Sequence, residues 1–188
     1  MKAARESWRQ KQPELDVKRL VFIDETGLNT KMTRLYGRSL KNQRCVAHVP
    51  HGHWQTTSMI AGLRYDGMVA PFLIPGAVDA QVFTAYLQHV LCPELRPGDI
   101  VILDNLSTHK IAAVKTLIEA HGASVYYLPA YSPDLNPIEM AFAKFKAHLR
   151  RSAARTSENL QTAVSLALSS FLPNQCLSFF RHAHYVSI

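Results

Sequence analysis

The chain has 188 residues, of which 47% are hydrophobic, so it is long enough for one domain with a complete core. Its 21 lysines and arginines outnumber its 14 aspartates and glutamates, and the net charge of +7 indicates a polyanionic partner. Three widely spaced cysteines and the lack of a long apolar run argue against a disulfide framework, a zinc knuckle and a membrane span.

The positive charges are gathered in two stretches. No acid occurs between Glu25 and Asp66, and Glu158 is the only acid after Glu139. A surface that merely keeps a protein soluble mixes both signs, so this segregation favours a face that binds nucleic acid. The cations of these stretches that we expect to contact DNA are Arg34, Arg38, Lys41, Arg44, Lys144, Lys146 and Arg150.

The N-terminal segment, 1–18, is polar and predicts a short helix or an ordered arm. The sequence RLVFID at 19–24 then predicts a strand, which the following ETG should end. Asp24 would lie at this strand end, where an acid either serves a site or opens a solvated turn. Because side chains alternate along a strand, Asp24 and Glu25 should point to opposite faces, and we choose Asp24 as the candidate for a site.

Residues 28–54 are basic and loop-like and contain the histidine-rich sequence HVPHGH. No cysteine pair or distant histidine motif completes a zinc site with these histidines, so we expect them to be structural or to contact phosphate. The runs at 56–63 and 68–74 are rich in β-forming residues, and the Asp-Gly turn between them predicts an antiparallel hairpin.

A second candidate acid follows the next strand. A helix is predicted from its cap, Asp79, to Leu91. The apolar run at 100–103 is then typical of a strand buried on both faces, and it places Asp104 at the carboxyl end. Open α/β sheets bind their ligands at that end of the strands, so Asp104 is a candidate site residue.

The sequence NLSTHK after Asp104 leads into another predicted helix, which starts at Ser107 or Thr108 and stops at Gly122. Asn105 and His109 either orient a ligand or contact phosphate, or they form the turn and cap the helix. We include His109 and Lys110 among the residues expected to contact DNA. A strand at 124–128 follows, and the predicted buried side of the helix consists of Ile111, Val114, Leu117, Ile118 and His121.

The segment 130–151, AYSPDLNPIEMAFAKFKAHLRR, joins a proline-rich turn to a helix. Pro137 is predicted as the first helical residue and Asn136 as its cap. Glu139 falls in the first turn, where an acid three residues after an Asn cap is also the pattern of a capping box. The apolar stripe of this helix should face the core and comprises Ile138, Phe142, Phe145 and Leu149.

Two more helices are predicted towards the C-terminus. Thr156 or Ser157 caps the first, and the second lies within residues 174–185. Small and apolar residues alternate in both, which fits packing against the sheet or against a partner subunit.

The three candidate acids, Asp24, Asp104 and Glu139, meet if the first and fourth strands are neighbours in a mixed sheet. Three carboxylates in one place repel one another unless a divalent cation lies among them, and oxygen ligands suit Mg²⁺. Two such ions about 3.5 to 4 Å apart can activate the attacking oxygen and stabilise the leaving oxygen of a phosphodiester. The surrounding basic surface would then bind the DNA.

Three motifs give the chain a resemblance to a known family. FIDETG at 22–27, LDNLSTHK at 103–110 and YSPDLNPIEMAFAKFK at 131–146 resemble the catalytic domain of IS630-group transposases, relatives of the Tc1/mariner transposases. The interval from Asp104 to Glu139 is similar to the D,D-34-E signature of that family. The resemblance implies an α/β, ribonuclease H-like fold with a mixed five-stranded sheet flanked by helices. It also implies that Asp24, Asp104 and Glu139 are the catalytic and metal-binding triad, with two Mg²⁺ or Mn²⁺ ions.

The resemblance further implies an organisation and an activity. We expect an N-terminal arm at 1–18, a catalytic domain at 19–151 and a C-terminal helical extension at 152–188 packed on the same domain. The implied activity is DNA cleavage at insertion-sequence ends and strand transfer into target DNA by a homodimer, in the bacterial cytoplasm at the nucleoid. Alternatives are a ribonuclease H-like nuclease that only hydrolyses and a non-catalytic DNA-binding remnant.

Full-length family members carry N-terminal helix-turn-helix modules that recognise the DNA ends. The segment before the first predicted strand, 1–18, is too short for such a module. A separate helix-turn-helix polypeptide or reading frame is therefore an expected partner.

Overall fold

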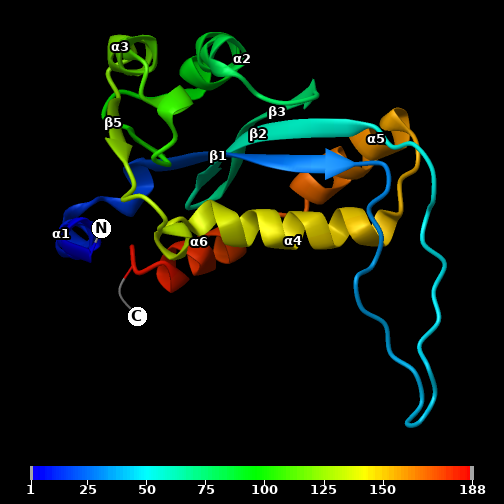
Figure 1. Ribbon diagram of the computed structural model, residues 1–188. Helices are drawn as coiled ribbons and strands as arrows, with labels where there is room; N and C mark the ends of the chain where they lie inside the picture. Colours follow the sequence, from blue (N-terminus) through cyan, green and yellow to red (C-terminus); the bar gives the residue numbers. More distant parts are fainter. Residues whose placement is uncertain (1, 187–188) are drawn as a thin grey trace.

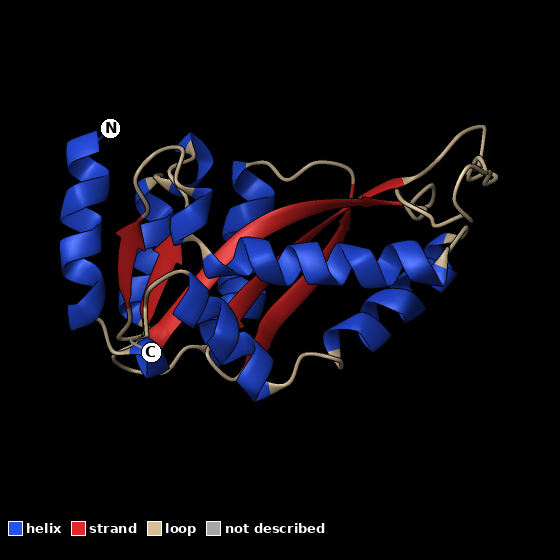
Figure 2. Ribbon diagram, turned by 90° about the horizontal axis from the view of Figure 1, so that it is seen from below, coloured by secondary structure: helices blue, strands red, loops and turns tan. Residues whose placement is uncertain are grey.

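The computed structural model describes residues 2–186. Its strands form one mixed sheet in the order β3-β2-β1-β4-β5, with helices on both faces (Figure 1; Figure 2). β1 pairs antiparallel with β2 and parallel with β4, which confirms that the first and fourth strands are neighbours. The strands are β1 (Leu20–Asn29), β2 (Thr56–Arg64), β3 (Gly67–Pro75), β4 (Ile100–Leu103) and β5 (Ser124–Tyr127).

The helices form two layers. α2 and α3 cover one face of the sheet, whereas α4 lies across the other face together with α5 and α6 (Figure 1). No single helix of the described residues is long and apolar enough to cross a membrane, and only α5 and α6 taken together as a bent pair pass that test. The helices are α1 (Lys2–Lys11), α2 (Ala80–Tyr86), α3 (Ala112–Ala120), α4 (Pro137–Ser152), α5 (Ser157–Leu168) and α6 (Pro173–His182).

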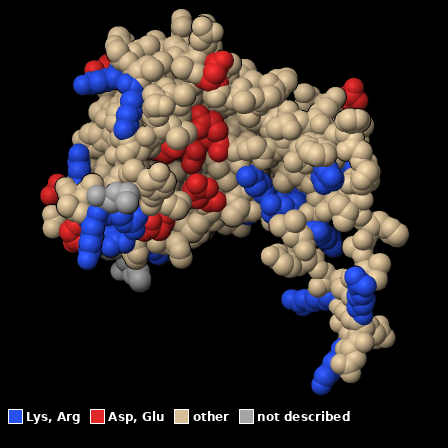
Figure 3. Space-filling view, in the orientation of Figure 1, with Lys and Arg blue, Asp and Glu red and all other residues tan. Residues whose placement is uncertain are grey.

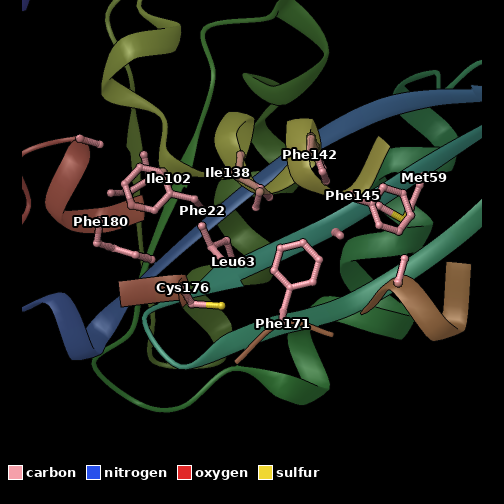
Figure 4. Close-up of a cluster of buried hydrophobic side chains, with 14 of the residues drawn as sticks. Phe22, Met59, Leu63, Ile102, Ile138, Phe142, Phe145, Phe171, Cys176 and Phe180 are labelled. Carbon is pink, nitrogen blue, oxygen red and sulfur yellow. The ribbon is translucent and has the colours of Figure 1, made fainter. Parts of the chain in front are cut away.

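The sheet separates two clusters of buried apolar side chains. Along β1 the residues alternate between them: Leu20 and Phe22 pack under α4, and Val21 and Ile23 pack under α2 and α3. Figure 4 shows the cluster on the α4 side. The apolar stripe predicted for α4 is confirmed, because its four side chains are at most 3% exposed.

β1 is longer than the sequence predicts. It runs on through Glu25 to Asn29 because β2 continues to pair with it, with Gly27 opposite Ser58. The predicted strand end after Asp24 is therefore wrong. The parallel pairing with β4 does stop here, at Phe22 opposite Ile102, and continuing the same register places Asp24 opposite Asp104.

Most other elements begin where expected. The hairpin of β2 and β3 is confirmed, and the side chains of Asp79 and Thr156 cap α2 and α5. α2 continues into a π-helical segment, Leu87–Leu91. α3 begins later than predicted, because residues 107–109 form a separate 3-10 turn, and His121, predicted to be buried, is exposed at its end.

Residues 31–55, which we call the arm, connect β1 to β2 and extend away from the sheet without regular secondary structure (Figure 1). Every residue from 34 to 49 is exposed. The arm therefore offers its side chains to solvent or to a partner.

The two ends of the described chain meet beside the turn that precedes α4. The indole N–H of Trp8 donates to the hydroxyl of Tyr185 (2.9 Å), which in turn donates to the backbone oxygen of Leu135 (2.8 Å). Gln12 donates to the backbone oxygen of Ala183 (2.9 Å), so α1 is fastened to the chain after α6.

Candidate active site

Asp24, Asp104 and Glu139 line one pocket of about 360 Å³ beyond the carboxyl end of β4. They come from the middle of β1, the residue after β4 and the first turn of α4. On the face of the molecule drawn in Figure 3, acidic side chains gather near the middle and basic side chains lie along the arm. The rest of the pocket wall consists of Asn105, Leu106, Leu128, Pro129, Ala130, Tyr131, Ser132, Pro133 and Asn136.

Asn136 precedes α4 as predicted, but its side chain does not cap the helix. Its Nδ2 donates to Oδ2 of Asp24 (2.9 Å), and only 4% of the residue is exposed. The capping-box interpretation of Glu139 is therefore wrong. The carboxylate of Glu139 is exposed and makes no hydrogen bond or ion pair with the described residues, so it is free to turn into the pocket.

Asp24 is partly buried and lies close to other acids. Burial, together with the negative charges of Glu139, Glu25 and Asp104, raises its pKa to about 7, against the opposing hydrogen bond from the Glu25 N–H to Oδ1 (2.8 Å). At neutral pH this pocket therefore holds more negative charge than the described residues neutralise.

Asp104 has a different environment. Its Oδ1 is hydrogen-bonded to Nδ1 of His109 (2.6 Å) and to the backbone N–H of Leu106 (3.0 Å). Burial alone would raise the pKa of Asp104, but these hydrogen bonds hold it below its usual range. Asp104 is thus kept as a carboxylate.

His109 is only 1% exposed and bridges two acids. Its other ring nitrogen, Nε2, lies 2.9 Å from Oε1 of Glu25. Burial would lower the pKa of His109, but the two carboxylates raise it to about 9. The prediction that His109 contacts DNA is wrong, because both ring nitrogens are engaged inside the protein.

Glu25 joins the site from the opposite face of β1. The prediction that it points away from Asp24 is consistent with its contact to His109, which packs 4.2 Å from the ring of Phe83 under α2. Sequence reasoning set Glu25 aside for that reason. No local sequence pattern indicates its contact with His109, because the two residues are 84 positions apart in the sequence.

The other predicted DNA contacts lie at several places. Arg34, Arg38, Lys41 and Arg44 are exposed on the arm. Lys110 is exposed beside a groove that runs between α1 and β5 and shares wall residues with the pocket. Lys146 and Arg150 are partly exposed one helical turn apart on α4.

Lys144 is engaged within the helical layer. Its ammonium group donates to the backbone oxygen of Ser170 (3.0 Å) and to the side chain of Gln175, and it lies 4.3 Å from the centre of the Phe171 ring. The charge of Lys144, which was predicted to contact DNA, joins α4 to the chain around α6 in this structure.

The pocket has the donor chemistry that a divalent ion requires. Three carboxylates supply hard oxygen ligands, which Mg²⁺ and Mn²⁺ prefer. Within residues 2–186, however, no three Asp, Glu, His or Cys side chains are arranged to hold an ion as they stand. Glu139 would therefore have to turn towards the aspartates.

Comparison with known proteins places this pocket in context. Residues 19–161 match the family described as DDE superfamily endonuclease. No curated protein sequence matches the chain.

Several solved structures share the fold at low sequence identity. The Mos1 transposase paired-end complex with left transposon end has a TM-score of 0.75 at 17% identity and covers 97% of this chain. The catalytic domain of Mos1 mariner transposase has a TM-score of 0.67 at 16% identity and covers 98% of this chain and 87% of that chain. The predicted ribonuclease H-like fold is thereby confirmed. The chain spans 57% of the transposase in the paired-end complex.

Proposed function

The chain belongs to the DDE superfamily endonucleases, and from this premise we propose that it is the catalytic domain of an IS630-group transposase. It would cut DNA strands at insertion-sequence ends and join the freed ends to target DNA. The observation that carries the proposal is the single pocket lined by Asp24, Asp104 and Glu139. The D,D-34-E spacing of Asp104 and Glu139 supports the assignment to this group.

The proposed roles follow from the contacts in the pocket. Asp24, Asp104 and Glu139 would hold two Mg²⁺ or Mn²⁺ ions, with Asn136 fixing the orientation of Asp24. When bound, such ions supply Lewis-acid activation of an attacking oxygen and charge stabilisation at a leaving oxygen. Water is the first nucleophile and the freed 3′-hydroxyl the second, so no covalent protein intermediate is needed. Tyr131, 87% exposed at the pocket wall, serves as a DNA contact.

DNA binding is assigned to the exposed cations of the arm and to Lys110, Lys146 and Arg150. The arm also exposes large apolar side chains, including Tyr36 (90%) and Val46 (77%), which suit contact with a second copy of the chain in a homodimer. Since the chain spans 57% of the Mos1 transposase chain, recognition of the DNA ends is assigned to a helix-turn-helix segment or polypeptide outside residues 1–188. The site of action is the nucleoid in the bacterial cytoplasm.

The first experiment tests cleavage. Purified chain is incubated with supercoiled plasmid and Mn²⁺ or Mg²⁺, and nicking is followed on gels. Asp104→Ala should reduce nicking to the level without metal while the circular-dichroism spectrum stays that of the parent. The matched control is Glu119→Ala, which removes an exposed acid on α3. Equal nicking by Asp104→Ala and the parent would reject the assignment.

A second experiment separates the three activities that this fold could support. A labelled, pre-cut DNA end is incubated with plasmid, and joined products are counted. Joining by the parent supports a transposase, and nicking without joining identifies a nuclease that only hydrolyses. DNA binding with neither reaction identifies a non-catalytic remnant.

A further inference from the structure

A buried histidine connects an acid of the pocket to an acid behind it. Nδ1 of His109 lies 2.6 Å from Oδ1 of Asp104, and its Nε2 lies 2.9 Å from Oε1 of Glu25. The three side chains are 31%, 1% and 19% exposed in the order Asp104, His109, Glu25. The histidine at the centre of the series is therefore buried, and the acid on each side of it is partly exposed.

The ring of His109 is held on several sides. Phe83 of α2 packs against it with the ring centres 4.2 Å apart. The hydroxyl of Tyr127, at the end of β5, donates to the backbone oxygen of His109 (2.9 Å) and so fixes the short turn that carries it. A histidine needed only to fill space would not require both ring nitrogens to meet carboxylates.

The two contacts fix the orientation of the imidazole ring. Each ring nitrogen lies within hydrogen-bond distance of a carboxylate oxygen, so the ring cannot turn without losing both contacts.

The hydrogen bonds also distinguish the two oxygens of Asp104. Oδ1 accepts from both His109 and the backbone of Leu106, whereas Oδ2 accepts none among the described residues. A carboxylate fixed through one oxygen has its other oxygen at a defined place. Oδ2 is therefore the oxygen of Asp104 that is left for a ligand.

We propose that Glu25 and His109 are positioning residues for the divalent ion, with Glu25 orienting His109 and His109 orienting Asp104. The inference rests on the proposed function, since it assumes that Asp104 is a metal ligand. Asp24, by contrast, is oriented by the neutral amide of Asn136 and by the backbone N–H of Glu25. The two aspartates are thus held by different means, and only Asp104 is held through a histidine that also contacts a second acid.

The test measures Mn²⁺ binding directly, by the electron paramagnetic resonance signal of free Mn²⁺ in titrations of the full chain without DNA. Groups that orient metal ligands typically change metal affinity by about 10- to 100-fold when removed, and we expect a loss of this size in His109→Ala. His109→Asn keeps an N–H donor near Asp104 and should recover most of the loss. Glu25→Gln keeps an acceptor for His109 without the charge and should lose less affinity than Glu25→Ala.

His121→Ala is the matched control. It removes an exposed histidine that follows α3 and does not line the pocket, so Mn²⁺ affinity should stay within about twofold of the parent. Melting temperatures of all variants, measured without metal, separate lost stability from lost affinity. If His109→Ala does not fold, the two Glu25 variants still decide the question.

A second readout separates ion positioning from a general loss of activity. In the nicking assay, His109→Asn and Glu25→Gln should need more Mn²⁺ for half-maximal rate but approach the rate of the parent at saturating Mn²⁺. Mn²⁺ affinity in His109→Ala and Glu25→Ala equal to that of the parent, together with its loss in Asp104→Ala, would overturn the positioning role alone. Unchanged affinity in Asp104→Ala as well would instead overturn the proposed metal site.

Discussion

Buried carboxylates at the two ends of β4 have different charge partners. Asp99, just before the strand, is 1% exposed and forms an ion pair with Arg64 of β2 at 2.5 Å. Burial would raise the pKa of Asp99, but Arg64 and the backbone N–H of Arg96 hold it below its usual range. At the other end of the strand, the ring of His109 contacts two carboxylates, those of Asp104 and Glu25. The remaining acids, Asp24 and Glu139, form no ion pair with a cation among the described residues.

The difference agrees with the proposed function, in which one end of β4 stabilises the fold and the other end binds a ligand. Asp99 lies outside the pocket, and the fold pairs this buried anion with one cation, Arg64. Where Asp24, Asp104 and Glu139 line the pocket, burial and, to a smaller extent, the neighbouring negative charges raise the pKa of Asp24 to about 7. A divalent ion is the balancing charge that the pocket would require.

The largest effect on stability should follow from removing Arg64, the cation that pairs with Asp99. Arg64→Met leaves Asp99 buried without its partner, and removing one member of a buried ion pair typically costs about 3 to 5 kcal/mol of unfolding free energy. Urea unfolding at pH 7 measures the loss. The double variant Arg64→Met, Asp99→Leu should restore much of the stability, since it leaves no unpaired charge. An unchanged midpoint in the single variant would contradict the role of this pair.

A smaller effect on unfolding free energy is expected at the pocket. In the presence of a chelator, the folded protein retains the proton of Asp24 up to about pH 7, whereas the unfolded chain loses it near 3.8. Unfolding free energy should therefore fall as the pH rises from about 4 to about 7, by about 2 to 4 kcal/mol, and level off above that range.

Asp24→Asn is the variant that isolates this contribution. It removes the titrating group and should flatten the decrease, and saturating Mg²⁺ should raise the stability of the parent near pH 8 but not that of the variant. Urea unfolding measured across the pH range supplies both curves. A parallel decrease in Asp24→Asn would assign the pH dependence to other groups.

The arm provides cations that neither end of β4 uses. Arg34, Arg38, Lys41 and Arg44 form no ion pair with the described residues, so replacing all four with Gln should change unfolding free energy by less than about 0.5 kcal/mol. The same change should reduce the slope of log affinity against log salt for duplex DNA by about three to four units. A DNA-binding titration at several salt concentrations measures it, and an unchanged slope would remove the arm from the DNA path.

The smallest effect is expected from Lys146, one cation on α4. Lys146→Ala should reduce the same salt slope by about one unit, because one phosphate contact is lost. Lys144→Ala is the comparison, since Lys144 binds Ser170 inside the protein and should leave the slope unchanged. Equal slopes for the parent and Lys146→Ala would remove that residue from the DNA surface.

The elements that local patterns specify were predictable from the sequence. The apolar run at 100–103 gave β4, the Asp-Gly turn gave the hairpin, and the stripe that begins at Ile138 gave the buried face of α4. The common pocket of Asp24, Asp104 and Glu139 was expected only if the first and fourth strands were neighbours, and the family resemblance implied it. The end of β1 was misjudged because pairing with β2 carries the strand through Gly27, and pairing between distant segments outweighs a local stop signal.

The contacts that organise the site were not predictable, because they join residues far apart in the sequence. Glu25 and His109 are separated by 84 residues, and Asp24 and Asn136 by 112. No periodicity or spacing records such pairs. Asn136 illustrates the limit: its sequence context indicates a helix cap, but its side chain makes no capping hydrogen bond and its Nδ2 donates to the carboxylate of Asp24.

The hydrogen-bond path from Trp8 through Tyr185 to Leu135 has a practical consequence for anyone who shortens or extends this protein. Leu135 lies one residue before the amide that orients Asp24. Deleting α1 or the last turn of the chain would therefore disturb the position of Asn136 in the pocket, although neither segment lines it. Both ends support the turn that carries Asn136. Truncating either end would therefore affect any assay of the catalytic residues.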